Sequence, residues 1–453
     1  MAQNDKNFNG IVDGVIWKQI LIFFFPLLLG TFFQQLYNTV DAVIVGRFAG
    51  KEALSAVGGA TGTLINLFVG FFTGISTGAT VTISQYYGGG HREDVGKAVH
   101  TAIAMAIAGG AVIMVIGLLG APYALRWMDT PEDIMAQSLI FIRIIFCGMI
   151  ANLVYNMGAG ILRAIGDSKR PLYILASSVI INIILDFIFV VGFHWDVAGV
   201  GIATLLSQIY SAVMVCLLLM RTKECYQLKL SQIRFHRGMF SRVIRIGLPA
   251  GFQSLMYSSS NVVIQANMNS FGTDTIAAWT AYGKIDALFW MTVSSFGIAI
   301  TTFAGQNYGA GKYDRVRQGA RVCLKMTLVV AIVLSIVLYF GGEYIFWLFT
   351  TDTQVIQKGM EILRFMAPTF WTYVFIEIFS GTLRGMGNSL IPMLLTCLGV
   401  CALRIVWLFT MVPIWPDVRT VIFSYPMTWS VTSILFIIYY RMYIRRNLPM
   451  EQA

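Results

Sequence analysis

The stretch AVHTAIAMAIAGGAVIMVIGLLGAP, residues 98–122, carries no Asp, Glu, Lys or Arg. Its apolar residues follow one another without the period-two alternation that is typical of a membrane-barrel strand. A helix needs about 20 apolar residues to cross a bilayer. The stretch therefore predicts a transmembrane helix, and residues 177–193, which hold Asp186 as their one charged residue, are also predominantly apolar.

The composition extends this prediction to the whole chain. Hydrophobic residues make up 57% of the sequence and charged residues 12%, whereas soluble domains have about 45–50% and about 25%. We therefore expect an all-α integral membrane protein. Twelve transmembrane helices are expected near residues 16–47, 52–86, 96–121, 134–163, 170–193, 198–221, 240–270, 275–305, 316–341, 356–383, 390–413 and 418–443.

An internal repeat divides the chain into two halves. LRAIGDSKRP (162–171) matches LRGMGNSLIP (383–392), and SQYYGGG (84–90) matches GQNYGAG (305–311), both at an offset of 221 residues. Each half holds six spans, an even number, so the copies form a parallel repeat about an axis along the membrane normal. We expect two six-helix lobes with a central cleft that opens when they rock; a duplication retained only for packing is the alternative. The expected boundaries are 15–221 for the N-terminal lobe, 222–238 for a cytoplasmic linker and 239–445 for the C-terminal lobe.

The repeated decapeptide reads as the break between two helices. Gly166 and Gly387 suit the left-handed position after a helix C-terminus. Asp167 or Asn388 can then cap the next helix, and the proline of each copy falls in its first turn. These residues predict a hinge and an anchor rather than chemistry.

The net charge of +10 comes from basic residues that are concentrated in the loops on one side of the expected membrane spans. Loops on the side of the two termini hold 22 Lys and Arg, and the opposite loops hold five. The positive-inside rule predicts cytoplasmic termini for a multi-pass protein of the inner (plasma) membrane. The basic surplus favours anionic lipid as a partner rather than nucleic acid, and we expect a monomer.

The sequence favours no enzyme chemistry. The six cysteines and four histidines lack metal-ligand spacing, and no Ser-His or Cys-His arrangement stands at helical spacing. We expect neither a metal site nor a cofactor.

Four acidic residues fall well inside spans: Asp41, Asp186, Asp286 and Glu377. A charge at mid-membrane costs about 2.5–3.5 kcal/mol or more, so such residues are functional candidates by default. For Asp286 we expect a buried ion pair with Lys284 or Arg404. Glu377 is interpreted as a second proton or cation site, or as the partner of a nearby donor.

Asp41 is the best candidate because polar residues precede it on one helix face. Asp186 likewise follows Asn182 by one turn. Both aspartates precede the outer ends of their spans by about 10 Å of helix rise, so they can share one depth. The alternative is that two polar faces merely tie the spans together. The polar stripe before Asp41 consists of Gln34, Tyr37 and Asn38.

Several polar and aromatic residues are candidates for lining the cleft. They lie on the first, fourth, seventh and tenth expected spans. They are Gln34, Asn156, Gln253, Tyr257, Asn261, Trp371 and Tyr373.

Segments in both halves resemble the multidrug and toxic compound extrusion (MATE) family. They are the proline-bearing first span ending in an Asp, GISTGATVTISQYYGGG, LRAIGDSKRP and INIILDFIFVVG, and the resemblance covers roughly residues 15–445. It implies a twelve-helix, two-lobe antiporter that expels hydrophobic organic cations, small-molecule partners, in exchange for H⁺ or Na⁺. The chain is most similar to the prokaryotic, H⁺-coupled, DinF-like branch. There the residues matching Asp41, Asn182, Asp186 and Thr204 form a hydrogen-bonded cluster whose protonation releases drug.

The second half departs from the Na⁺-coupled pattern. Where those relatives carry acids on the seventh and tenth spans, this chain has Tyr257 and Tyr373. H⁺ is therefore the favoured coupling ion, while a Na⁺ site around Asp41 and Asp186 stays open. A lipid-linked precursor flippase of the same superfamily is the other alternative.

Overall fold

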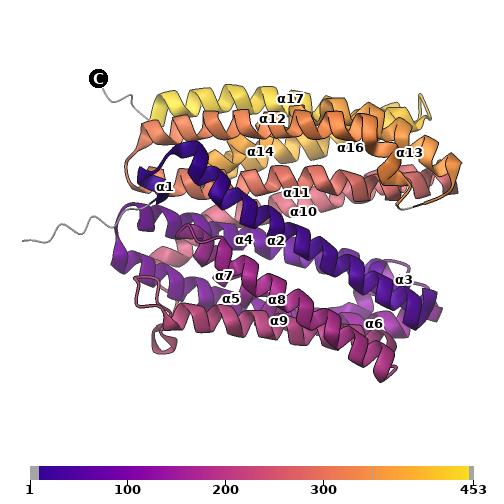
Figure 1. Cartoon of the computed structure of the whole chain (residues 1–453), viewed down its shortest axis with the longest axis horizontal. Coiled ribbons are helices and arrows are strands. Elements are labelled where there is room, and N and C mark those ends of the chain that lie inside the picture. The colour runs from indigo at the N-terminus through magenta and orange to yellow at the C-terminus, as the bar shows by residue number, and fades with distance from the viewer. Residues whose placement is uncertain (1–9, 349, 448–453) are drawn as a thin grey trace, which may run out of the picture. The chain divides into compact units, whose positions relative to one another are not determined.

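The computed structural model describes residues 10–348 and 350–447, which form helices and connecting segments without a strand (Figure 1). The first half contains α1 (Gly10–Asp13), α2 (Ile16–Ile44), the π-helical η1 (Val45–Ala49), α3 (Gly50–Gly58), α4 (Ala60–Gly88), α5 (Arg92–Trp127), α6 (Glu132–Cys147), α7 (Met149–Ala164), α8 (Lys169–Asp186), the π-helical η2 (Phe187–Gly192), α9 (Asp196–Arg221) and the 3₁₀ turn η3 (Leu230–Gln232). The second half contains α10 (Arg237–Asn269), α11 (Thr273–Gly309), α12 (Tyr313–Phe346), α13 (Thr353–Met366), the 3₁₀ turn η4 (Ala367–Thr369), α14 (Phe370–Gly385), α15 (Leu390–Thr396), the π-helical η5 (Cys397–Ala402), α16 (Leu403–Met411) and α17 (Val418–Asn447).

The helices have the length and composition of membrane spans. Within the described ranges, ten helical stretches are long and apolar enough to cross a bilayer, or eleven when α6 and α7, bent by 47°, count as one. The remaining expected span corresponds to α10. This helix has 33 residues but is too polar to count among the apolar stretches. Its polar face bears Gln253, Tyr257 and Asn261, all expected to line the cleft.

The chain divides into two compact units. Phe25–Gly251 forms the N-terminal unit, and the segments up to Phe24 and from Phe252 form the C-terminal unit. Both divisions fall inside a helix, within α2 and within α10. The expected lobe boundaries, which fall at loops, stay a prediction.

One helix lies at the centre of each unit. In the N-terminal unit α7 packs against α4, α5 and α9, and in the C-terminal unit α14 packs against α11, α12 and α17. Ten of the sixteen residues of α7 and twelve of the sixteen of α14 are buried. Adding 221 to the residue numbers of α7 gives the bounds of α14. The sequence repeat therefore corresponds to a repeat in how the central helices pack.

The repeated decapeptide breaks two helices as predicted. Gly166 and Gly387 have φ of 96° and 90°, and their N–H groups donate to the carbonyls of Arg163 and Arg384 at 3.0 and 2.8 Å. Asp167 Oδ1 accepts from the N–H groups of Lys169 and Arg170, both at 3.1 Å. The cap and the left-handed glycine therefore give α8 its start.

Glycines allow α4 and the first part of α10 to pack at backbone distance. A Cβ on Gly247 would lie 2.6 Å from the carbonyl oxygen of Ile75, and one on Gly251 would lie 2.7 Å from that of Phe71. Gly74 and Gly78 face the same contact from α4. Both helices thus carry glycines four residues apart, the spacing that lets membrane helices approach closely.

Candidate coupling and substrate site

Two aspartates of the N-terminal unit stand beside irregular helix turns. Asp41 lies on α2 four residues before η1, and Asp186 is the last residue of α8, directly before η2. The two π-helical segments contact each other, with Phe48 and Phe187 edge to face. Such segments recur at functional sites because they redirect side chains within a continuous helix.

The two carboxyl groups are buried together. Asp41 is 9% exposed and Asp186 is fully buried, and the two carboxyl groups lie close enough to interact electrostatically. Oδ1 of Asp41 and both oxygens of Asp186 have no hydrogen-bond partner in the described chain. Neither forms an ion pair with a described Lys or Arg.

This arrangement has a definite chemistry. Two neighbouring buried carboxylates repel one another, so a proton on one of them stabilises the pair. A pair of this kind binds and releases protons as a unit. A positively charged ligand nearby would compete with those protons.

Neighbouring polar residues complete the cluster. The Tyr37 hydroxyl donates to Thr204 Oγ1 at 3.1 Å, which joins α2 to α9. Asn182 is fully buried, one turn before Asp186, and neither of its side-chain polar atoms has a partner among the described residues. Of the stripe expected with Asp41, Tyr37 is half-buried, whereas Gln34 and Asn38 are exposed.

Asn156 lies away from the aspartates, on α7. Its side-chain N–H donates to the carbonyl of Asn152 at 2.9 Å, and its own carbonyl accepts from Ser76 Oγ at 3.1 Å. It lines a cavity of about 230 Å³ together with Phe72, Met105 and other apolar side chains. A cavity of this lining suits an apolar or aromatic ligand.

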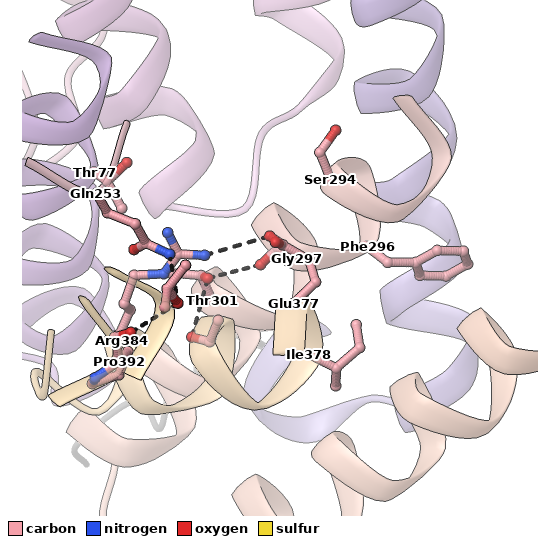
Figure 2. Close-up of polar contacts among 12 residues, drawn as sticks. Thr77, Gln253, Ser294, Phe296, Gly297, Thr301, Glu377, Ile378, Arg384 and Pro392 are labelled. Atoms are coloured by element: carbon pink, nitrogen blue, oxygen red, sulfur yellow. Dashed lines mark hydrogen bonds and ion pairs between the residues drawn. The ribbon is translucent and has the colours of Figure 1, made fainter. Parts of the chain in front are cut away.

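The C-terminal unit contains a separate polar chain. Tyr257 and Tyr373 hydroxyls lie 3.2 Å apart, and Tyr373 donates to Glu377 Oε2 at 3.3 Å. Arg384 reaches Glu377 Oε1 at 3.4 Å, as Figure 2 shows. A Cβ on Gly297 would overlap the Glu377 carboxyl group, so the glycine makes room for it. Glu377 therefore has the nearby donors that one of its two interpretations required, Arg384 and Tyr373. Its role as a second proton or cation site stays a prediction.

The expected ion pair of Asp286 is wrong. Its oxygens accept from the Tyr282 hydroxyl at 3.2 Å and from Trp290 Nε1 at 2.7 Å. Arg404 instead lies over the Tyr425 ring, 4.1 Å from its centre. Two aromatic donors, each four residues from Asp286 along the same helix, take the place of the expected cation. This i, i+4 spacing could have been found in the sequence.

The other expected cleft residues are dispersed in the C-terminal unit. Gln253 is 8% exposed and donates to Thr396 Oγ1 at 3.2 Å. Asn261 is exposed, and Trp371 is 46% exposed. Their contact with a substrate stays a prediction.

A polytopic helical fold with two repeated units and a buried acid pair is the architecture typical of a membrane transporter. The family model MatE matches residues 26–188 and 249–410, once in each half. The chain belongs to the MatE family. This membership confirms the family, the fold class and the transporter class that the sequence predicted.

Similar proteins agree with this membership. The chain is 28% identical over 437 residues to "Probable multidrug resistance protein YoeA" of Bacillus subtilis (strain 168), covering 94% of each chain. It is 27% identical over 387 residues to "Probable multidrug resistance protein NorM" of Bacillus cereus, covering 84% of each.

Solved structures share the fold. A multidrug resistance MATE family transporter of the MOP superfamily in an outward-facing conformation has a TM-score of 0.91 at 20% identity, with 97% of this chain and 98% of that chain covered. A MOP superfamily transporter from Pyrococcus furiosus has a TM-score of 0.89 at 21% identity, with coverage of 96% and 97%.

Proposed function

We propose that this protein is a multidrug efflux antiporter that exports hydrophobic organic cations in exchange for H⁺. The observation that carries the proposal is the buried Asp41–Asp186 pair, which has no basic partner among the described residues. The protein would act as a monomer in the plasma membrane with both termini in the cytoplasm. The names of the relatives supply the multidrug class.

The proposed cycle exchanges charge at one place. With the pair deprotonated or sharing one proton, its negative charge attracts a cationic substrate. Protonation from the outer side removes that charge and releases the cation, and deprotonation toward the cytoplasm resets the site. One proton per unit of pH gradient supplies about 1.4 kcal/mol, a tenfold concentration ratio of a substrate.

Na⁺ coupling is the second candidate, and one observation favours it. Within the cluster, side-chain oxygens of Asp41, Asn182 and Asp186 have no hydrogen-bond partner among the described residues. Hard cations favour several oxygen ligands. The two candidates differ in which gradient drives efflux.

Vesicles containing the purified protein test the proposal. A pH gradient, acidic on the side that receives the substrate, should drive a fluorescent organic cation across the membrane, and a Na⁺ gradient of equal size should not. Asp41→Asn should reduce this transport to the level of empty vesicles because the amide cannot take up a proton. Asp133→Asn, which neutralises an exposed acid of the same unit, is the matched control and should transport normally.

Two outcomes would contradict the proposal. Full pH-driven transport by Asp41→Asn would remove the aspartate from the coupling step. Transport driven by Na⁺ alone would favour the second candidate.

A further inference from the structure

A groove of about 600 Å³ lies between α12, α14 and α17 in the C-terminal unit. Four arginines line it, Arg317 and Arg321 from α12 and Arg441 and Arg445 from α17. Each pair is spaced by one helical turn, so both side chains face the groove. The remaining lining side chains are apolar or aromatic.

The charged and apolar parts lie at different depths. The arginines belong to the first turns of α12 and the last turns of α17, whose ends lie at the same level because the helices run antiparallel. Leu324 lies about 5–10 Å of helix rise beyond the two arginines of α12, and Ile437 lies about 6–12 Å from those of α17. Between them, Phe379 and Tyr440 stack with ring centres 4.4 Å apart. The groove thus runs from a basic mouth to an apolar end about 10 Å further along the helix axes.

Most of this positive charge is not neutralised by the protein. Arg317 forms an ion pair with Asp314 at 2.8 Å. Arg321, Arg441 and Arg445 form no ion pair with any residue that the structure describes. Guanidinium groups gathered in this way favour an anion, and their planar donors match phosphate oxygens.

We propose that this groove is a binding site for an anionic phospholipid. The arginines at the mouth contact the phosphate of the headgroup, and an acyl chain lies over Leu324, Phe379 and Tyr440. Basic pockets between membrane helices near the cytoplasmic surface are a recurrent way to recognise acidic headgroups. The site is separate from the carboxyl cluster and adds a lipid of defined charge to the partners of the transporter.

The other half of the repeat supports this assignment by contrast. Displaced by 221 residues, the four arginine positions become Gly96, His100, Met220 and Glu224. There a segment of the chain itself lies against α5 and α9, the counterparts of α12 and α17. The N–H of Leu228 donates to the Leu219 carbonyl at 2.9 Å, and the N–H of Lys229 donates to His100 Nε2 at 3.0 Å.

The contrast shows what a protein occupant of this surface requires. Leu228 is 2% exposed and fills the covered surface with an apolar side chain, and neutral or mixed charges surround it. The groove of the C-terminal unit instead presents four arginines. The added charge is complementary to a phosphate and serves no purpose for an apolar segment.

Native mass spectrometry of the purified full-length protein tests the site. Dioleoyl phosphatidylglycerol, dioleoyl phosphatidylcholine and glycerol phosphate would be added separately. We expect the protein to retain phosphatidylglycerol at least about tenfold more than phosphatidylcholine, because the headgroup charge supplies the difference. Glycerol phosphate, which lacks acyl chains, should not compete.

Two variants probe the two ends of the groove. Arg321→Gln with Arg441→Gln removes charge at the mouth and should abolish the preference for phosphatidylglycerol. Leu324→Trp fills the apolar end without changing charge and should lower retention of both lipids. Arg221→Gln with Arg237→Gln, at exposed positions outside the groove, makes the same charge change and should bind like the unmodified protein.

The proposal is overturned if the unmodified protein retains both lipids equally, or if both groove variants bind like the control. Competition by glycerol phosphate would reveal a simple anion site instead. A large rise in lipid binding on removal of residues 448–453 would mean that the chain's own segment occupies the groove. None of these measurements involves transport, so their failure leaves the proposed antiport untouched.

Discussion

At the scale of single residues, the cluster around Asp41 combines one satisfied hydrogen bond with several unsatisfied polar atoms. Tyr37 and Thr204 pair at 3.1 Å, whereas Asn182 and Asp186 have side-chain atoms without donors or acceptors in the described chain. Buried polar groups without partners destabilise a fold. Their presence is understandable if a proton or a cation completes the set during the cycle.

The Tyr37–Thr204 bond leads to a first prediction at this scale. Tyr37→Phe and Thr204→Val each remove one hydrogen-bonding group and should slow coupled efflux several-fold, because the bond positions α2 against α9. The double variant should be no slower than the single ones, since both remove the same bond. Initial efflux rates at several pH values measure this, and additive losses would show that the two residues act separately.

Individual acids show where sequence reasoning succeeds and where it ends. The depth of Asp41 and Asp186 was predictable because helix rise is regular. The partners of Asp286 were not, because two cations and two aromatic donors lay within plausible reach and only packing selects among them. Glu361 likewise contacts Arg419, a residue 58 positions away, which no local spacing indicates.

At the scale of helices, α2 and α10 each hold a proline close to a point where the chain divides into units. Pro26 and Pro249 lie within two residues of the two points where the chain divides into units. A proline inside a helix removes one hydrogen bond and weakens it locally. We interpret these positions as flexible points within otherwise continuous helices.

Replacement of the prolines tests that interpretation. Pro26→Ala and Pro249→Ala restore a helical hydrogen bond and should raise the thermal midpoint of the purified protein. The same changes should slow transport, because a stiffer helix resists the rearrangement, while equilibrium binding of the fluorescent cation stays the same. Unchanged transport rates in both variants would show that the prolines are not needed for movement.

The glycine contact between α4 and α10 leads to a prediction of opposite sign. Gly247→Leu should destabilise the protein by about 1–3 kcal/mol or more, because the side chain would meet the backbone of Ile75. Gly238→Leu is the control on the same helix, where a Cβ meets nothing within 4 Å. Thermal unfolding in detergent measures both, and equal midpoints would contradict the close packing.

At the scale of the molecule, the repeat could be recognised because both copies of the decapeptide need a glycine with positive φ at the same position. Residues with a Cβ adopt that left-handed conformation only at a cost in free energy, so the glycine is present in both copies. The polarity of α10 was also visible in its sequence. The division of the chain inside α2 and α10 was not, since loops are the ordinary expectation for boundaries. Side-chain packing, rather than helix length, determines where a unit ends.

Topology leads to the prediction for the whole chain. The 22-to-5 bias of basic residues predicts that the segment between α9 and α10 faces the cytoplasm and the segment between α12 and α13 faces outward. In a cysteine-free background, Thr351→Cys should react with an impermeant maleimide on intact cells. Ser231→Cys should react only after permeabilisation; the reverse pattern would invert the topology.

The central claim is that protonation of the Asp41–Asp186 pair releases a bound organic cation. Its most direct test is release of a fluorescent cation from the purified protein, titrated separately with pH and with Na⁺ at constant ionic strength. We predict that release increases as the pH falls, that Na⁺ has no effect, and that Asp41→Asn removes the pH dependence. Release that is independent of pH, or a pH profile that Asp41→Asn leaves unchanged, would contradict the claim.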